Sequence, residues 1–227
     1  MWLVVCLLLG GFWVFAASSR SGFDHWSTAV RGVLGGLAAL GLASIGYGLL
    51  QLAGLTLSWS FIAEGTWPAL GGAVMVGLVE EGGKAVGASL ATLRGRLGKK
   101  TVLGTTLVVA SVFAVAEGTL ALRGADWPVA VTRLALGPVA HGLFAAPFAV
   151  ALAEAGGLAP GRAALRIGSS VLLSALLHGL GDFCLAKAGW GQAGFATTLL
   201  APALWLYVRA RPTLFLRWAV GPSAHSP

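Results

Sequence analysis

Long apolar stretches separated by short polar segments dominate the chain, and their lengths predict membrane-spanning helices. A helix needs about 20 mostly apolar residues to cross a bilayer. Seven stretches approach or exceed that length, near residues 2–17, 32–57, 68–91, 101–122, 127–153, 165–187 and 193–208. The pattern therefore predicts an all-α fold, a polytopic transmembrane helical bundle with about seven spans.

The first apolar stretch, residues 2–17, also resembles a signal peptide, because it ends in small residues at positions 16–18. A signal peptide normally has a basic residue before its apolar segment, and this stretch has none. Arg20 and Arg31 follow it instead. We therefore interpret the stretch as a retained first span whose N-terminal end lies outside the cytoplasm.

Composition supports the membrane assignment. Hydrophobic residues make up 57% of the chain and charged residues only 10%, and the mean hydropathy is +0.84. Such a charge deficit argues against a disordered chain and against a soluble domain. The 34 glycines are typical of helices that pack closely in a bilayer. No internal repeat or large loop divides the sequence, so we expect residues 1–227 to form a single membrane domain.

The two cysteines, Cys6 and Cys184, both lie in apolar stretches and form no Cys-x-x-Cys pair. Neither a zinc ribbon nor a disulfide framework is therefore expected.

Basic residues are distributed unevenly between the two sides of the predicted bundle. Eleven of the 15 fall on one side, namely Arg20, Arg31, Arg94, Arg96, Lys99, Lys100, Arg162, Arg166, Arg209, Arg211 and Arg217. The other side holds only Arg123, Arg133 and Lys187. The positive-inside rule then predicts an outside N-terminus and a cytoplasmic C-terminus in a multi-pass protein of the cell membrane. The same distribution explains the net charge of +7 without any nucleic-acid partner.

Ionisable residues inside the predicted spans are the candidate functional residues, because each costs at least about 2.5–3.5 kcal/mol at a span centre. They are Glu80, Glu81, Lys84, Glu117, His141, His178 and Asp182. Packing alone does not need so many costly groups. Water chemistry, metal binding or ion transport does.

Two pairs in this set lie four residues apart and therefore share a helix face. Glu80 is placed to pair with Lys84, which leaves Glu81, rotated by about 100°, to point at a cavity as a general base. His178 and Asp182 form the second pair, in which the carboxylate can orient the imidazole. A purely structural reading, with ion pairs that fasten packed helices, stays open for both pairs.

Several protease motifs are absent or incomplete. The zinc-binding His-Glu-x-x-His motif does not occur. Residues 179–182 read Gly-Leu-Gly-Asp and residues 202–204 read Pro-Ala-Leu, as in presenilin-type aspartyl proteases. That mechanism needs a second aspartate inside the membrane. Asp24 and Asp126 lie at span edges or in loops, which argues against it.

Four motifs, in order, resemble those of the PrsW family of intramembrane proteases. Residues 80–84 read Glu-Glu-Gly-Gly-Lys, and residues 113–117 read Phe-Ala-Val-Ala-Glu. Arg133 followed by His141 resembles the next motif, and residues 178–182, His-Gly-Leu-Gly-Asp, resemble the last. Together they cover a motif-bearing core at residues 68–187. Phe113, Lys84 and Arg133 are the supporting residues of these motifs, and Arg133 is interpreted as a helix-end anchor.

Two positions depart from the family pattern. Gly118 follows the second motif, where Asn is usual, and Asp182 occupies the place of a more usual Asn.

The resemblance implies hydrolysis of peptide bonds in membrane-embedded or membrane-anchored proteins. PrsW proteins are themselves similar, more distantly, to the CAAX prenyl endopeptidases. In this interpretation Glu80 or Glu81, with Glu81 preferred, activates a water molecule. His178, oriented by Asp182, stabilises the oxyanion or protonates the leaving amine.

Glu117 and His141 would hold the water or a metal ion. Glu117, His141 and His178 are the candidate ligands if a divalent metal such as zinc binds. A metallo- and a glutamic-type endopeptidase both stay open. The expected partners are a membrane-protein substrate and the lipid bilayer. An ion- or proton-coupled transporter and a catalytically inactive scaffold are the alternatives.

Overall fold

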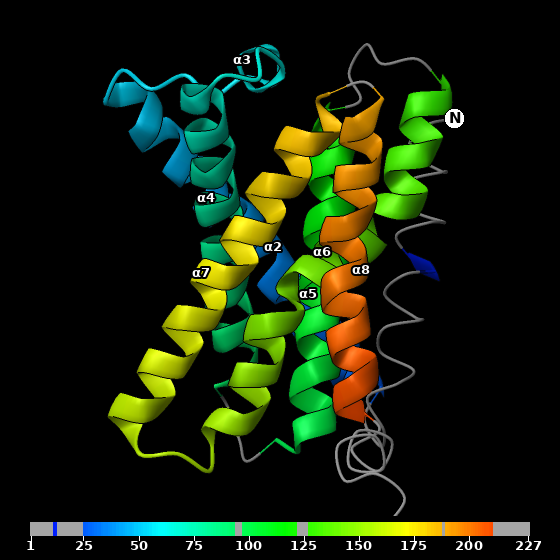
Figure 1. Cartoon of the computed structure of the whole chain (residues 1–227). Helices are drawn as coiled ribbons and strands as arrows, with labels where there is room; N and C mark the ends of the chain where they lie inside the picture. The colour runs from blue at the N-terminus through cyan, green and yellow to red at the C-terminus, as the bar shows by residue number, and fades with distance from the viewer. Residues whose placement is uncertain (1–10, 13–24, 94–96, 122–126, 188, 211–227) are drawn as a thin grey trace, which may run out of the picture.

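The computed structural model describes residues 11–12, 25–93, 97–121, 127–187 and 189–210, and helix is the only regular secondary structure in this part of the chain. The helices are α2 (His25–Leu52), α3 (Trp59–Ala63), α4 (Trp67–Thr92), α5 (Lys99–Ala121), α6 (Trp127–Ala155), α7 (Pro160–Leu185) and α8 (Trp190–Ala210). Six of these helices are long. Figure 1 shows them side by side, with the short α3 at the end of the bundle where α4 begins. The all-α fold class is therefore confirmed.

Six long helices match the second to seventh predicted spans. The predicted first span lies outside the described residues, apart from residues 11–12, and so does Cys6. Of the loop residues used above, Arg20, Asp24, Arg94, Arg96, Arg123, Asp126, Arg211 and Arg217 also lie outside them. The count of about seven spans thus stays a prediction.

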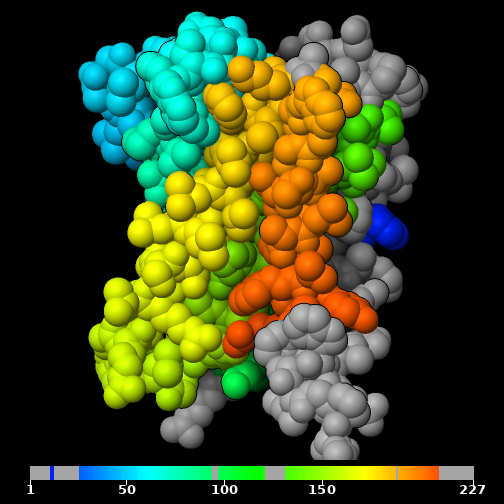
Figure 2. Space-filling view, viewed as in Figure 1, coloured from blue at the N-terminus to red at the C-terminus, as the bar shows by residue number. Residues whose placement is uncertain are grey.

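Four of the described helices, α2, α5, α6 and α7, are long and apolar enough to cross a membrane. Large apolar side chains also cover the outside of the bundle, among them Leu34, Ile45, Leu172, Leu200 and Leu204. Figure 2 shows the face formed mainly by α7 and α8. An outer surface this apolar is stable in lipid and unfavourable in water, so the chain is a multi-pass membrane protein.

Helix boundaries follow local signals. Thr66 caps α4, because its side-chain oxygen accepts a hydrogen bond from the Ala69 amide at 3.3 Å. Gly54 and Gly65 adopt positive φ angles of 81° and 70° in the turns on either side of α3. The helix predicted near 32–57 ends at Leu52, before the turn at Gly54. It begins earlier than predicted, at His25, because the charged side chain of Arg31 interrupts the apolar run without ending the helix.

Close backbone contacts bring α4 and α7 together. A Cβ atom added to Gly77 would lie 2.2 Å from the Ala175 carbonyl oxygen, and one added to Gly179 would lie 2.6 Å from the Ala73 carbonyl oxygen. Only glycine permits this approach. Because Gly179 follows His178, the contact places that imidazole against the glutamates of α4.

A second contact of this kind joins α2 to α4 through Gly35 and Gly87. Helix α5 packs against α2 and α6, and α6 packs against α7, so four helices surround the charged segment of α4. At the opposite end from α3, Glu154 of α6 forms ion pairs with Arg166 of α7 and Arg209 of α8. This clamp fastens the ends of three helices.

Candidate functional site

Glu81 lies at the centre of a buried charge cluster. The same carboxylate oxygen, Oε1, lies 2.6 Å from Lys84 Nζ and 2.7 Å from His178 Nδ1. The side chains of Glu81 and Lys84 are both 0% exposed. Because an ionised carboxylate only accepts hydrogen bonds, His178 donates through Nδ1, which leaves its Nε2 atom available for other contacts.

Lys84 connects this cluster to α5 and α6. Its Nζ atom lies 2.7 Å from His141 Nδ1 and 4.5 Å from the centre of the Phe113 ring. An ammonium group only donates, so His141 Nδ1 accepts and the proton of the neutral ring resides on Nε2. That Nε2 atom lies 3.5 Å from Glu117 Oε2. Phe113, the supporting aromatic residue of its motif, therefore covers the lysine rather than contacting solvent.

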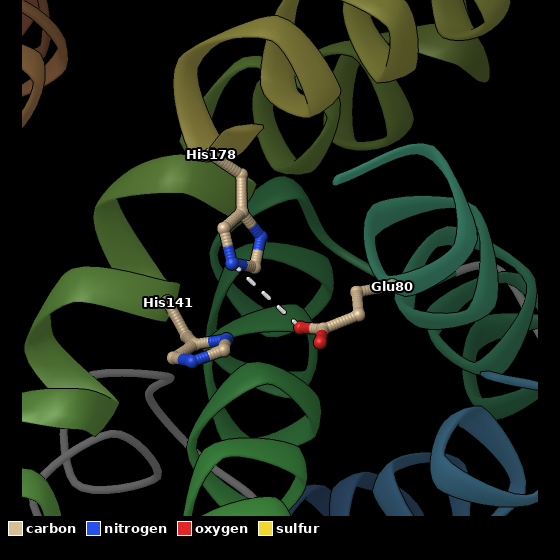
Figure 3. Close-up of side chains that lie close together, drawn as sticks. All are labelled: Glu80, His141 and His178. Atoms are coloured by element: carbon tan, nitrogen blue, oxygen red, sulfur yellow. Dashed lines mark ion pairs between the residues drawn. The ribbon is translucent and has the colours of Figure 1, made fainter. Parts of the chain in front are cut away.

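Glu80 has a different environment from Glu81. Its Oε1 atom accepts a hydrogen bond of 2.8 Å from the Tyr47 hydroxyl. Its Oε2 atom is buried and has no hydrogen-bond partner among the described residues. Oε2 lies 3.7 Å from His178 Nε2 and 3.6 Å from Lys84 Nζ, too far for direct hydrogen bonds. Figure 3 shows Glu80 reaching from α4 toward the rings of His141 and His178.

His178 is held on several sides. Its Nε2 atom lies 3.5 Å from Asp182 Oδ2 on the next turn of α7. The Phe144 ring stacks on the imidazole with a centroid distance of 4.9 Å, and the His141 ring meets it edge-on at 5.0 Å. The predicted pairing of His178 with Asp182 is therefore seen in the structure. These contacts restrict the imidazole to one orientation.

A cavity of about 460 Å³ reaches this cluster from the α3 end of the bundle. Glu80, Glu117, His141, His178 and Asp182 all line it, whereas Glu81 and Lys84 do not. Most of the remaining wall is apolar. Of the seven candidate residues, five thus contact the cavity and two lie behind them as a buried support.

The pairing predicted for the two adjacent glutamates is reversed. We expected Glu80 to pair with Lys84 and Glu81 to face a cavity, but the closer lysine contact is made by Glu81, and Glu80 lines the cavity. The spacing of four residues allowed the first arrangement. The position of His178 on α7 favours the observed arrangement, because Glu81 can contact both Lys84 and the His178 imidazole, which leaves Glu80 on the cavity wall.

The candidate metal ligands also change. Among the described residues, donor atoms of Glu80, His141 and His178 lie within 4.8 Å of one another, whereas the predicted set had Glu117 in place of Glu80. Glu80 Oε2 has no hydrogen-bond partner among the described residues, and a neutral His178 that donates through Nδ1 has a lone pair on Nε2, so both atoms fit a divalent cation. His141 fits less directly, because its Nδ1 atom already contacts Lys84.

Arg133 lies on the cavity wall, two turns into α6, and its guanidinium stacks over the Trp59 ring at 5.6 Å. It therefore belongs to the cavity as well as to the end of a helix. Tyr47 and Trp59 were not predicted as site residues. Tyr47 is one of only two tyrosines in the chain and lies inside an apolar stretch, which is the one signal that pointed to it.

Comparison with protein-family models, with curated proteins and with solved structures finds no match for this chain.

Proposed function

We propose that the chain is an intramembrane protease that hydrolyses peptide bonds of membrane-embedded or membrane-anchored proteins. The observation that carries the proposal is the Glu80 Oε2 atom. It is buried, it has no hydrogen-bond partner among the described residues, and it lies beside an imidazole on the wall of the cavity of about 460 Å³. A carboxylate held in this way is suited to accept a proton from water.

Glu80 acts as the general base in this proposal, whereas the sequence alone favoured Glu81. Its Oε2 atom and His178 Nε2 are 3.7 Å apart, so one water molecule can contact both. Glu80 takes one proton while the water oxygen bonds to the substrate carbonyl carbon. The carbonyl oxygen becomes an oxyanion. In this metal-free route His178 is an imidazolium, with one proton on Nδ1 toward Glu81 and a second on Nε2, and the Nε2 proton stabilises the oxyanion.

The second half of the reaction breaks the carbon–nitrogen bond. The leaving amine receives the proton that Glu80 took from water, either directly or through His178, and the other product is a carboxylic acid. Glu81 and Asp182 hold the imidazole in position throughout. Lys84 balances the negative charge of the adjacent carboxylates, since its Nζ atom lies close to both Glu80 and Glu81.

A divalent cation is compatible with the same residues. Glu80 and His178 would hold it, and His141 would join them if its Nδ1 atom exchanged the Lys84 contact for the cation. The cation would supply polarisation of the water and of the substrate carbonyl. Glu81 bonded to His178 Nδ1 is the kind of carboxylate–histidine contact that orients metal ligands. A metallo- and a glutamic-type peptidase thus share one set of side chains.

The four motifs that resemble the PrsW family support this proposal, because their residues form the cluster described above. The distribution of basic residues supports a location in the cell membrane with an outside N-terminus and a cytoplasmic C-terminus. In that orientation the cavity and α3 lie toward the outer side, whereas the clamp around Glu154 lies toward the cytoplasm.

The decisive experiment compares new protein N-termini in membranes from cells that express the wild type, Glu80→Gln or Glu64→Gln at matched levels. Glu64 is exposed at the end of α3 and serves as the matched control. We expect a set of N-termini that disappears in Glu80→Gln and persists in Glu64→Gln. If all N-termini persist in a normally folded Glu80→Gln variant, the chain is not a protease that uses this base.

Two alternatives have distinct outcomes in related assays. A proton-coupled transporter would use the buried acids and histidines as a relay. It would move protons across liposomes in a Glu80-dependent way without cleaving peptides. An inactive scaffold would show neither cleavage nor flux, and substitutions in the cluster would reduce only its abundance.

A further inference from the structure

Arg133 is a cation on the wall of the cavity, and most of that wall outside the Glu/His cluster is apolar. Its guanidinium lies over the Trp59 ring, and none of the described carboxylates forms an ion pair with it. Glu117 lines the same cavity, but its Oε2 atom contacts His141 Nε2 at 3.5 Å. A guanidinium presents five hydrogen-bond donors in a planar fork, so this one is available to an anionic ligand.

The apolar part of the cavity wall favours a ligand that is mostly apolar. Ile62, Val76, Leu136, Phe195 and Leu199 line the cavity. A charge pair in such surroundings is stronger than one in water, because solvent screening is weak there. The matching ligand therefore combines an apolar body with a carboxylate.

Exposed tryptophans place Arg133 near the membrane surface. Trp59, Trp67 and Trp190 begin α3, α4 and α8 at the same end of the bundle, and all three are exposed. Tryptophans are enriched at the level of the lipid headgroups. Because Arg133 stacks on the first of them, a carboxylate bound there would lie at the membrane interface while the rest of the ligand extends into the bilayer.

We propose that Arg133 selects peptide substrates by binding a carboxylate at the membrane interface on the α3 side. This inference rests on the proposed protease function and names its substrate class: an apolar segment with an acidic group next to it. Trp59 positions the guanidinium, and Arg133 determines specificity without taking part in bond breaking. The carboxylate can belong to an acidic side chain or to a chain terminus.

The helix geometry predicts the register of that carboxylate. Arg133 and His141 lie on the same helix, eight positions apart, which corresponds to about 12 Å along its axis. An extended peptide advances about 3.3 Å per residue. The carboxylate should therefore lie about three to four residues from the bond that Glu80 and His178 cleave.

The test measures binding and cleavage separately. Purified protein in phosphatidylcholine nanodiscs is mixed with fluorescent apolar peptides that carry Glu, Gln or Lys four residues from a central cleavage position. Further peptides carry the carboxylate only at the C-terminus, or an amide there. Binding is followed by fluorescence anisotropy in the Glu80→Gln background, and cleavage is followed in the otherwise unchanged protein.

The variants are Arg133→Gln and Arg133→Glu, with Arg162→Gln as the matched control. Arg162 is exposed on α7 at the far end of the bundle. The control substitution therefore removes one positive charge without changing the cavity. We expect the control to prefer the Glu peptide over the Gln peptide by about tenfold or more, as a charge-assisted hydrogen bond would produce. Arg133→Gln should lose this preference, and Arg133→Glu should prefer the Lys peptide.

Each result has a distinct meaning. The proposal is wrong if Arg133→Glu retains the wild-type preference. It is also wrong if oleic acid binds in an Arg133-dependent way and the Glu peptide does not, since the cavity would then bind a lipid carboxylate rather than a peptide. A preference that follows the C-terminal carboxylate rather than Glu identifies a chain terminus as the source. If charge-dependent binding is seen but no peptide is cleaved by the wild type, the protease function fails while the Arg133 site stands.

Discussion

Neutralising Glu81 should destabilise the protein far more than neutralising Glu80, although the two residues are adjacent. In Glu81→Gln, one oxygen can no longer serve as an anionic acceptor for both Lys84 Nζ and His178 Nδ1, which now lie 2.6 and 2.7 Å from it. Lys84 is fully buried, so its charge would lose its closest counterion without gaining water. The variant thus leaves a buried ammonium group poorly compensated.

The expected cost follows from this burial. Removing one partner of a buried ion pair typically costs about 3–5 kcal/mol. The glutamine oxygen still accepts one hydrogen bond, so we expect the lower end, about 3 kcal/mol, or roughly a hundredfold in the unfolding equilibrium. Glu80→Gln should lower the free energy of unfolding by about 1 kcal/mol or less. The amide oxygen can still accept the hydrogen bond from Tyr47, and Lys84 keeps its ion pair with Glu81.

Reversible unfolding in mixed micelles with increasing sodium dodecyl sulfate would measure both variants. The double variant Glu81→Gln/Lys84→Met provides the control, because it removes the buried charge together with its counterion. It should recover a large part of the stability that Glu81→Gln loses. Equal stability of Glu80→Gln and Glu81→Gln would refute this reasoning, and so would a double variant less stable than Glu81→Gln.

Two further predictions concern the supports of the site. Gly179→Ala should lower the free energy of unfolding by about 1–3 kcal/mol and reduce cleavage, because the new Cβ atom would lie 2.6 Å from backbone atoms of α4. The control Gly82→Ala should do neither, because nothing lies within 4 Å of its Cβ position. Thermal unfolding and peptide cleavage measure both effects, and equal behaviour of the two variants would contradict the close contact. Tyr47→Phe should slow cleavage about tenfold by removing the hydrogen bond to Glu80, with the protein still folded; an unchanged rate would show that Tyr47 does not position the base.

Much of the fold follows from local properties of the sequence. The apolar runs predicted helices near 68–91 and 127–153, and the structure has Trp67–Thr92 and Trp127–Ala155. The agreement is close because an apolar run of that length has one stable form in lipid, a helix that satisfies its own backbone hydrogen bonds. The short helix α3 was not predicted, since five residues are too few to produce a hydropathy signal.

The membership of the site could also be inferred from the sequence. Charged groups inside a membrane are costly, so their positions in the apolar runs were sufficient to select Glu80, Glu81, Lys84, His141 and His178. Which of the two glutamates pairs with Lys84 and which lines the cavity could not be inferred. Spacing along one helix allows Lys84 to reach either glutamate, at three or at four residues.

Tertiary structure decided that question and two others. Glycine contacts between α4 and α7 place His178 against Glu81, which commits that carboxylate to the buried support and leaves Glu80 on the cavity wall. Packing of α3 against α4 and α7 brings the Trp59 ring within reach of Arg133 on α6. Packing of α2 against α4 brings the Tyr47 hydroxyl to Glu80. The hydropathy of single segments thus determined the helices and the ionisable residues inside them. Which of those residues face the cavity was determined by contacts between distant segments, and no local sequence pattern encodes such contacts.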